Sequence, residues 1–284
     1  MAKKSMLLAV TWVAVSLPAF GADPPKVQWT SGPGVVSLGD QAELSLKAGQ
    51  AFANAKDTQT LMEAMGNTIS GHEVGLVRPL AEHEDWLLVF EHHNVGFVKD
   101  DEKNSIDKNA LFKSISEGTE EGNKRRKELG ISALHVTGWF EEPHYDATTH
   151  NLVWALRAKD DGGGEVVNYN MRILGRTGYM SVVLIDEPAK LPTSKPIADR
   201  IMNGFSYKSG NKYAEFRSGD RLAEYGLTAL IAGGAGAAAA KLGLFAALWK
   251  ILAKGGKAIV VLVVGAIAGL KRMISALFNR NKET

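Results

Sequence analysis

Four β-rich runs follow one another along the chain and are joined by short connections. They are "ALHVTGWFE" (133–141), "NLVWALRA" (151–158), "EVVNYNMRIL" (165–174) and "YMSVVLID" (179–186). Strands joined by a few residues lie side by side and run in opposite directions, because a parallel neighbour needs a long crossover connection. The sequence therefore predicts an antiparallel β-meander, and this is the firmest constraint on the fold.

Shorter β-rich runs precede the meander. "GVVSLGDQAELSL" predicts two strands around a Gly-Asp turn, and the runs at 85–91 and 95–100 predict a hairpin around "HHN". Three helices are expected as well. Asp57 caps a short helix that Gly66 ends, residues 105–130 form a longer one, and a third opens at Ser194 and ends before Gly204. Together these elements predict an α+β fold, with an antiparallel β-meander sheet and helices on one face.

The first residues have the three parts of an export signal. Lys3 and Lys4 precede the apolar run "MLLAVTWVAVSL", and Pro18, Gly21 and Ala22 follow it. This pattern predicts a signal peptide at 1–22 and an exported domain at 23–210, with a buried N-terminal helix or an uncleaved anchor as alternatives. The chain has no cysteine, so the domain folds without disulfides and any membrane attachment is made by polypeptide.

The C-terminal part contains two apolar runs separated by lysines. The first, 226–249, is interrupted by Lys241. A lysine near the centre of a span costs about 2.5–3.5 kcal/mol of insertion free energy, which offsets most of the favourable insertion free energy of the apolar residues in this run. The second, 258–270, is uncharged and reaches the bilayer thickness if it extends to Phe278. We therefore expect a membrane-associated helical region at 226–278, with 258–278 as its firmest span. A buried helical pair in a soluble domain is the alternative.

Two arrangements of this region stay open. A single C-terminal membrane helix leaves the C-terminus in the cytoplasm, whereas a helical hairpin puts it outside. In both, residues 211–225 are a juxtamembrane linker, suited in composition to a helix at the membrane surface, and 279–284 are a polar tail. Small residues in the first run favour close helix packing and a homo-oligomer, namely Gly233, Gly234 and Gly236.

The net charge of +2 gives no basic field of the kind that nucleic-acid binding needs. The expected partners are the lipid bilayer and, secondarily, another envelope protein. No cofactor is expected. The predicted location is the inner membrane of a bacterium, with the main domain in the periplasm.

The stretch "EPHYDATTHN" is the best candidate for a functional loop. His144 and His150 are six residues apart, which is neither the spacing of a helical zinc pair nor that of neighbours on a strand face, and Asp146 is typical of a turn. The favoured interpretation is an exposed loop that contacts a ligand or partner through Trp139, His144, Tyr145 and His150. The alternative is a metal site of His144, Asp146 and His150 in a periplasmic metal-dependent hydrolase.

A second polar group lies within the meander. His135, Asn168, Asn170 and Arg172 fall on neighbouring strands, where they line a groove or form the water-facing side of the sheet. No Ser, His and Asp set is recognisable as a catalytic triad. The three glycines at 162–164 join two antiparallel strands and do not open a helix, so they are not a phosphate-binding loop.

Several long motifs carry a resemblance to a known family. They are "QWTSGPGVVSLGDQAEL", "GFVKDDEK", "LHVTGWFEEPHYDATTHNLVWAL", "VNYNMRILGRTGYMSVVLI" and "KYAEFRSGDRLAEYGLTALIAGGAGAAAAKLG". Over roughly 27–250 the chain resembles a family of uncharacterised bacterial membrane-anchored proteins, defined as a domain of unknown function. The resemblance implies export, an α+β outer domain and a C-terminal anchor, and it assigns no reaction and no ligand. The ending "IADRIMNGFSY" is similar in architecture alone to photosystem-associated and Mog1-like nuclear-import domains.

The function that fits these features best is that of a non-enzymatic, membrane-anchored envelope protein. Its periplasmic domain would serve as a binding or interaction module. The metal-dependent hydrolase is kept as the rival hypothesis.

Overall fold

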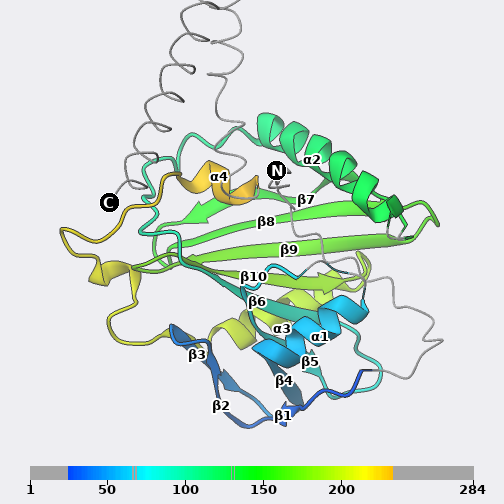
Figure 1. Ribbon diagram of the computed structural model, residues 1–284, viewed down its shortest axis with the longest axis horizontal. Helices are drawn as coiled ribbons and strands as arrows, with labels where there is room; N and C mark the ends of the chain where they lie inside the picture. The colour runs from blue at the N-terminus through cyan, green and yellow to red at the C-terminus, as the bar shows by residue number, and fades with distance from the viewer. Residues whose placement is uncertain (1–24, 66, 68, 129, 131, 233–284) are drawn as a thin grey trace, which may run out of the picture. The chain divides into compact units, whose positions relative to one another are not determined.

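The computed structural model describes residues 25–232 apart from 66, 68, 129 and 131. Its centre is an eight-stranded sheet in the order β1-β4-β5-β6-β10-β9-β8-β7, and every neighbouring pair is antiparallel (Figure 1). The strands are β1 (Thr30–Ser31), β4 (Gln50–Asn54), β5 (Glu73–Pro79), β6 (Leu87–His93), β7 (Leu134–Asp146), β8 (Asn151–Asp160), β9 (Glu165–Leu174) and β10 (Tyr179–Asp186).

The predicted meander is confirmed. Strands β7 to β10 are consecutive both in sequence and in the sheet, and alternate residues face opposite sides. On β9, Val167, Tyr169 and Met171 point into one apolar core, while Val166 and Leu174 point into a second core on the other face. The α+β class follows from this antiparallel sheet and the few helices packed on it.

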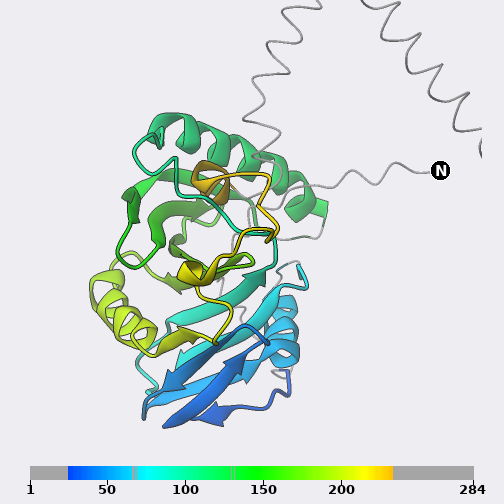
Figure 2. The ribbon, with the colours of Figure 1, turned by 90° about the vertical axis from the view of Figure 1, so that its left-hand side faces the viewer.

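The two faces of the sheet are covered differently. One face packs against α3 (Leu191–Met202) and against a three-stranded sheet of β11 (Phe205–Tyr207), β3 (Ala42–Leu46) and β2 (Gly34–Leu38). The other face carries α1 (Ala55–Ala64), α2 (Lys108–Glu128) and α4 (Leu227–Ile231). Figure 2 shows α3, in yellow-green, and α1, in blue, on opposite sides of the sheet.

The prediction of helices on one face is therefore wrong for α3. Its buried side chains, Leu191, Ala198 and Ile201, join the core that the small sheet closes. An apolar stripe on a helix specifies that one side is buried, but it does not specify which face of a sheet buries it.

The predicted hairpin of 85–91 with 95–100 is also wrong. β6 pairs instead with β5 and with β10, and its register with β10 runs from Tyr179↔His93 to Ile185↔Leu87. After β6 the chain turns away, and Phe97 forms a parallel bridge with Leu222. The backbone of β6 thus forms hydrogen bonds with β5 on one side and, on the other, with β10, which lies far away in the sequence.

The N-cap of the first helix differs from the predicted Asp57. The first helix starts after Asn54, whose side chain accepts a 3.1 Å hydrogen bond from the backbone N–H of Asp57. Asn54 is therefore the N-cap, and Asp57 lies in the first helical turn, where its charge is favourable.

The folded unit continues past the predicted boundary at residue 210. The side chain of Arg176 forms two 2.7 Å contacts with the carboxylate of Asp220, and the hydroxyl of Tyr213 donates to the carbonyl of Val98 at 3.0 Å. The expected surface helix is instead a short 3-10 turn, η1 (Tyr213–Glu215), followed by loop. Residues 211–225 thus belong to the domain in addition to leading towards the tail.

The start of the predicted membrane region, at 226, needs the same correction. Leu227, Leu230 and Ile231 of α4 are at most 2% exposed and pack into the core on the α1 and α2 face, because protein side chains are available there to bury them. The predicted signal peptide, the apolar stretches after Ala232, and Gly233, Gly234 and Gly236 lie outside the described residues. Within the described part of the chain, no helix is long and apolar enough to cross a bilayer.

Candidate functional site

The stretch predicted as a functional loop is mostly strand. β7 continues to Asp146, so that His144 and Tyr145 pair with Val153 and Leu152 of β8, and only the turn up to His150 is loop. His144 is exposed, and its Nδ1 atom lies 3.2 Å from the carbonyl oxygen of Glu142. Trp139, another predicted contact, is partly buried and packs against Phe112 of α2, with ring centroids 5.9 Å apart.

The three alternative metal ligands have separate roles. Asp146 accepts hydrogen bonds from the backbone N–H of Thr148 at 2.8 Å and from the hydroxyl of Thr149 at 2.9 Å, as a turn aspartate does. His150 has its Nδ1 atom 3.1 Å from the hydroxyl of Tyr145 and its ring 4.3 Å from that of Tyr213. Among the residues that the structure describes, no three His, Cys, Asp or Glu side chains are grouped so as to hold a metal ion.

A different group of polar side chains lies on the face of the sheet that carries α1 and α2. We call it the polar strip and define it as Glu91, Asn168, Asn170, Arg172 and Ser181. The strand register sets these residues side by side, since Glu91 of β6 is opposite Ser181 of β10, and Ser181 is opposite Arg172 of β9. Glu91, Asn168, Asn170 and Ser181 are all buried, in the middle of an otherwise apolar face.

A row of stacked rings runs beside the polar strip. His93 stacks on Tyr179 with ring centroids 4.7 Å apart, and His72 lies 4.4 Å from His93 on the other side. The guanidinium of Arg172 lies 4.7 Å from the ring centre of Trp154 and 6.0 Å from that of Tyr179. One residue from each of four adjacent strands, β6, β10, β9 and β8, thereby contributes to a continuous cationic and aromatic row.

Burial alters the acid–base behaviour of this group. It lowers the pKa of Arg172 and of His93 and raises the pKa of Tyr179. For His93, the carboxylate of Glu91, 3.4 Å from Nε2, opposes that effect. Burial would raise the pKa of the neighbouring Glu73, but N–H groups of Ser70 and Gly71 bind its carboxylate and lower it overall. Such clusters of perturbed groups are concentrated at functional sites in proteins.

Three buried atoms of the polar strip have no hydrogen-bond partner among the described residues. They are Oδ1 of Asn168, Nε of Arg172 and Oγ of Ser181. Buried polar atoms in folded proteins are nearly always paired, because leaving one unpaired costs about 1–3 kcal/mol. The strip thus has an unpaired donor at Arg172 opposite the hydroxyl of Ser181, and an unpaired acceptor at Asn168, four residues earlier on the same strand as Arg172.

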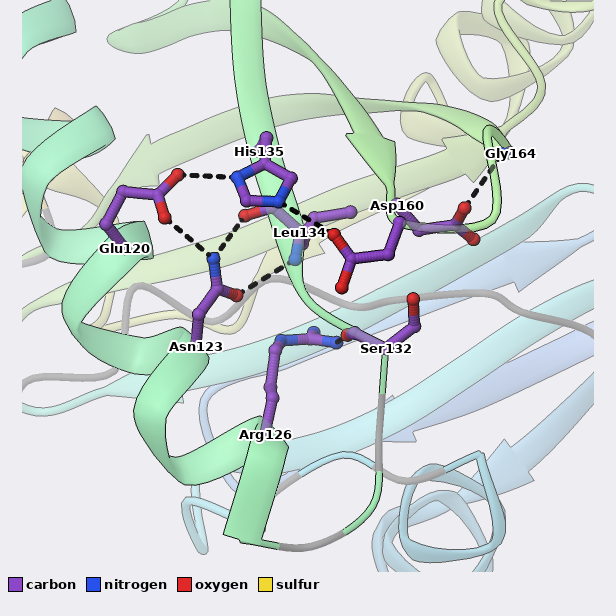
Figure 3. A network of polar contacts seen from close by, with 9 residues as sticks. Glu120, Asn123, Arg126, Ser132, Leu134, His135, Asp160 and Gly164 are labelled. Atoms are coloured by element: carbon purple, nitrogen blue, oxygen red, sulfur yellow. Dashed lines mark hydrogen bonds and ion pairs between the residues drawn. The ribbon is translucent and has the colours of Figure 1, made fainter.

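His135, which the sequence grouped with the asparagines, belongs to a separate network. Its Nδ1 atom lies 2.8 Å from Glu120 of α2 and its Nε2 atom 3.0 Å from Asp161 (Figure 3). Both carboxylates raise the pKa of His135. In the same network the amide of Asn123 bonds to the backbone N–H and carbonyl of Leu134, which fastens α2 to β7. These groups are largely exposed, so we interpret the network as structural.

Sequence reasoning therefore found part of the polar strip and missed the rest. Asn168, Asn170 and Arg172 were selected because they alternate along one strand, and they do share a face. His93 was missed because it was placed in the hairpin turn, and Glu91 was missed because its strand was paired with 95–100 and not with β10. Tyr179 and Ser181 also alternate at the start of their strand. The same pattern would have predicted that they share a face of the sheet with Arg172.

Residues 30–268 match the model of a family described as a protein of unknown function, DUF2167. The chain belongs to the DUF2167 family. The predicted resemblance to a family of unknown function is thus confirmed, and the matched region extends past residue 250 into the second apolar run of this DUF2167 protein.

One solved structure similar to this DUF2167 protein is the solution structure of cyanobacterial PsbP (CyanoP) from Synechocystis sp. PCC 6803. The identity is 14%, the TM-score is 0.38, and the match covers 64% of this chain and 92% of that one. No curated protein matches the sequence.

Proposed function

We propose that this DUF2167 protein is a membrane-tethered binding module of the bacterial envelope, with its domain in the periplasm and its ligand on the polar strip. The observation that carries the proposal is the set of unpartnered buried atoms on Asn168, Arg172 and Ser181. A bound ligand would supply the hydrogen bonds that the sheet itself leaves unmade.

The strip favours a small polar ligand that carries both an acceptor and a donor, such as a carboxamide or an amino acid. Nε of Arg172 donates only, Oδ1 of Asn168 accepts only, and Oγ of Ser181 does either. Trp154 and Tyr179 provide flat surfaces beside these atoms, and apolar residues line the remaining face. A site with a few polar atoms in an apolar surround is typical of small-molecule binding.

Tethering is supported by the sequence at the two ends. The export-type pattern at 1–22 and the uncharged apolar run at 258–270 are those of an exported chain with a C-terminal membrane segment. We also propose that His144 contacts a protein partner at the edge strand, together with Tyr145 near the end of the same strand and His150 in the turn that follows it. The proposed function needs no catalytic residue.

Binding is tested by native mass spectrometry of the full-length protein, purified in mild detergent from the membranes of its own host. We expect a small molecule to co-purify with the wild type and to be lost in Asn168→Ala and Ser181→Ala. Ser206→Ala, at an exposed position of β11, is the matched control and should retain the molecule. The absence of any bound mass from the wild type would contradict a ligand on the strip.

Tethering is tested separately by flotation of envelope membranes. The wild type should float with the lipid. Leu262→Arg combined with Ile267→Arg should release the chain, because each arginine costs about 2.5–3.5 kcal/mol at the centre of a span. A wild-type chain that stays in the soluble fraction would contradict the tether and leave the binding result unaffected.

A further inference from the structure

Two large apolar side chains are exposed on the segment that leads to the C-terminal region. Phe216 is 38% exposed and Leu222 is 45% exposed. The ring of Phe216 packs on that of Phe97, and the backbone of Leu222 forms a parallel bridge with that of Phe97. We define Phe97, Phe216 and Leu222 as the Phe216 patch. The loop that carries the patch projects at the left of Figure 1, in yellow and orange. Exposed apolar groups gathered in one place indicate a contact surface.

The patch is held in place by specific contacts. The ring of Phe97 lies between those of Tyr213 and Phe216, with centroids 4.4 and 4.2 Å away. The backbone N–H of Phe97 donates to the carbonyl of Arg221 at 2.8 Å, and the N–H of Ala223 donates to the carbonyl of Phe97 at 2.9 Å. Because these contacts order the loop in advance, little conformational entropy remains to be lost when the patch binds.

Side chains of both charges lie near the patch, and two of the carboxylates are engaged. Asp220 forms a bidentate pair with Arg176, and Glu215 accepts hydrogen bonds from the backbone N–H groups of Gly210 and Lys212. Lys212 and Arg217 are exposed near Phe216 in the chain. The guanidinium of Arg221 donates to Asn94, and Glu224 is an exposed carboxylate two residues after Leu222. Apolar residues flanked by arginine and lysine are the composition of surfaces that lie at the boundary of an anionic bilayer.

The patch also lies close in the chain to the proposed tether. After Leu222 the backbone enters the core through Tyr225 and α4, where the N–H of Thr228 donates to Glu102 at 3.0 Å. The described chain ends at Ala232, ten residues after Leu222, and 52 residues with both remaining apolar stretches follow it (233–284). The patch therefore lies on the segment through which the domain is joined to its C-terminal region.

We propose that the Phe216 patch contacts the bilayer surface, with Phe216 and Leu222 among the lipid headgroups and Arg217 close to the lipid phosphates. This inference rests on the proposed tether and adds an orientation, in which this end of the sheet faces the membrane. The patch would then hold the domain in one orientation relative to the bilayer.

The lack of cysteine makes the test direct, because a single introduced cysteine can be labelled uniquely. Full-length Phe216→Cys and Leu222→Cys chains are labelled with an environment-sensitive fluorophore. They are then reconstituted into vesicles of phosphatidylethanolamine and phosphatidylglycerol that contain a nitroxide-labelled lipid. Val35→Cys and Leu80→Cys are matched controls, since these apolar residues are also exposed, at 65% and 45%, but lie away from the patch.

We expect the probes at 216 and 222 to show blue-shifted emission that the nitroxide lipid quenches, and the probes at 35 and 80 to remain in water. A chain that floats with the vesicles while the probes at 216 and 222 stay unquenched overturns the orientation and leaves the tether intact. Quenching at all four positions also overturns it, because no particular surface is then selected. A chain that does not float at all overturns the tether and this inference together.

Discussion

The guanidinium of Arg172 lies over the ring of Trp154 and next to that of Tyr179, on a sheet face where most neighbours are apolar. Burial lowers its pKa, and among the described residues its hydrogen bond runs from Nη1 to the carbonyl of Met171 at 3.2 Å. The nearby carboxylate of Glu91 forms its ion pair with His93. A charge desolvated in this way costs stability unless something else compensates it.

This arrangement predicts that Arg172 serves binding more than folding. Arg172→Met should leave the free energy of unfolding within about 1 kcal/mol of the wild type or raise it by up to about 4 kcal/mol, as replacement of poorly paired buried charges often does. Urea unfolding of the full-length protein measures this. Leu184→Ala, at a fully buried position, is the control and should lose about 2–5 kcal/mol. A comparable loss in Arg172→Met would assign the arginine to the folding of the sheet instead.

His92 predicts a dependence of stability on pH. Burial lowers its pKa from 6.5 to about 4, and the neighbouring His93 and His72 add to this. The unfolded chain therefore takes up the proton first, so the free energy of unfolding falls as the pH drops from about 6.5 towards about 4. His92→Asn should remove about 1 kcal/mol of that fall, after allowance for the partial exposure of the ring.

His135 is the matched comparison, because its pKa is shifted in the opposite direction. Its contribution is present below the pKa of the unfolded chain and is lost as the pH rises through the raised value in the folded protein. His135→Asn should therefore weaken the protein at about pH 5.5 more than at about pH 9. Thermal melts at both pH values measure the two variants. Parallel pH profiles for His92→Asn and the wild type would refute the assignment to His92.

At the scale of elements, α4 shows how tertiary contacts override a membrane-like sequence. Its Leu227, Leu230 and Ile231 belong to the first apolar run, yet they are buried in the domain. The side chain of Glu102 also binds the start of this helix through the N–H of Thr228. Apolar residues are solvated equally well by lipid and by a protein interior, so composition alone does not distinguish the two.

The position of α4 leads to a direct test. Leu230→Ala should lower the free energy of unfolding of the domain by about 2–5 kcal/mol, because it removes buried methyl groups and leaves a cavity. Leu222→Ala is the control and should change it little, since Leu222 is 45% exposed. Both are measured in detergent by thermal unfolding of the full chain. If Leu230→Ala unfolds like the wild type, α4 is not part of the core.

At the scale of the whole molecule, the burial of α4 changes the expected topology. Residues 226–232 belong to the folded domain. Only residues 233–249 of the first apolar run therefore remain for a membrane span, and Lys241 is at the middle of this stretch. That remainder is shorter than a span of about 20 residues and carries a charge. Of the two arrangements that the sequence left open, a single span at 258–278 is now our expectation, and the packing of Gly233, Gly234 and Gly236 in an oligomer stays a prediction.

A single span puts the C-terminus in the cytoplasm. An alkaline phosphatase fused after Thr284 should therefore be inactive, because this enzyme folds only after export, whereas a fluorescent protein at the same place should fluoresce. A fusion after Ala22 that retains the signal provides the exported control. An active phosphatase at the C-terminus would indicate the hairpin.

The sequence by itself determined the features that depend on neighbouring residues. Alternating apolar positions and short turns specified the meander from β7 to β10, and the apolar pattern specified the long helix α2. Asn168, Asn170 and Arg172 were also placed on one face in this way, because side chains two apart on a strand point in the same direction. The family resemblance came from motifs that are likewise contiguous.

Only the tertiary structure decided which distant segments meet. Glu91 and His93 reach Ser181, Tyr179 and Arg172 because β6 pairs with β10, which follows it by about 90 residues, and no local pattern specifies that partner. The same holds for α3 on the second face and for Leu222 beside Phe97. Such contacts are selected by the combined burial and hydrogen bonding of the whole domain, which is why the polar strip became visible only in the folded chain.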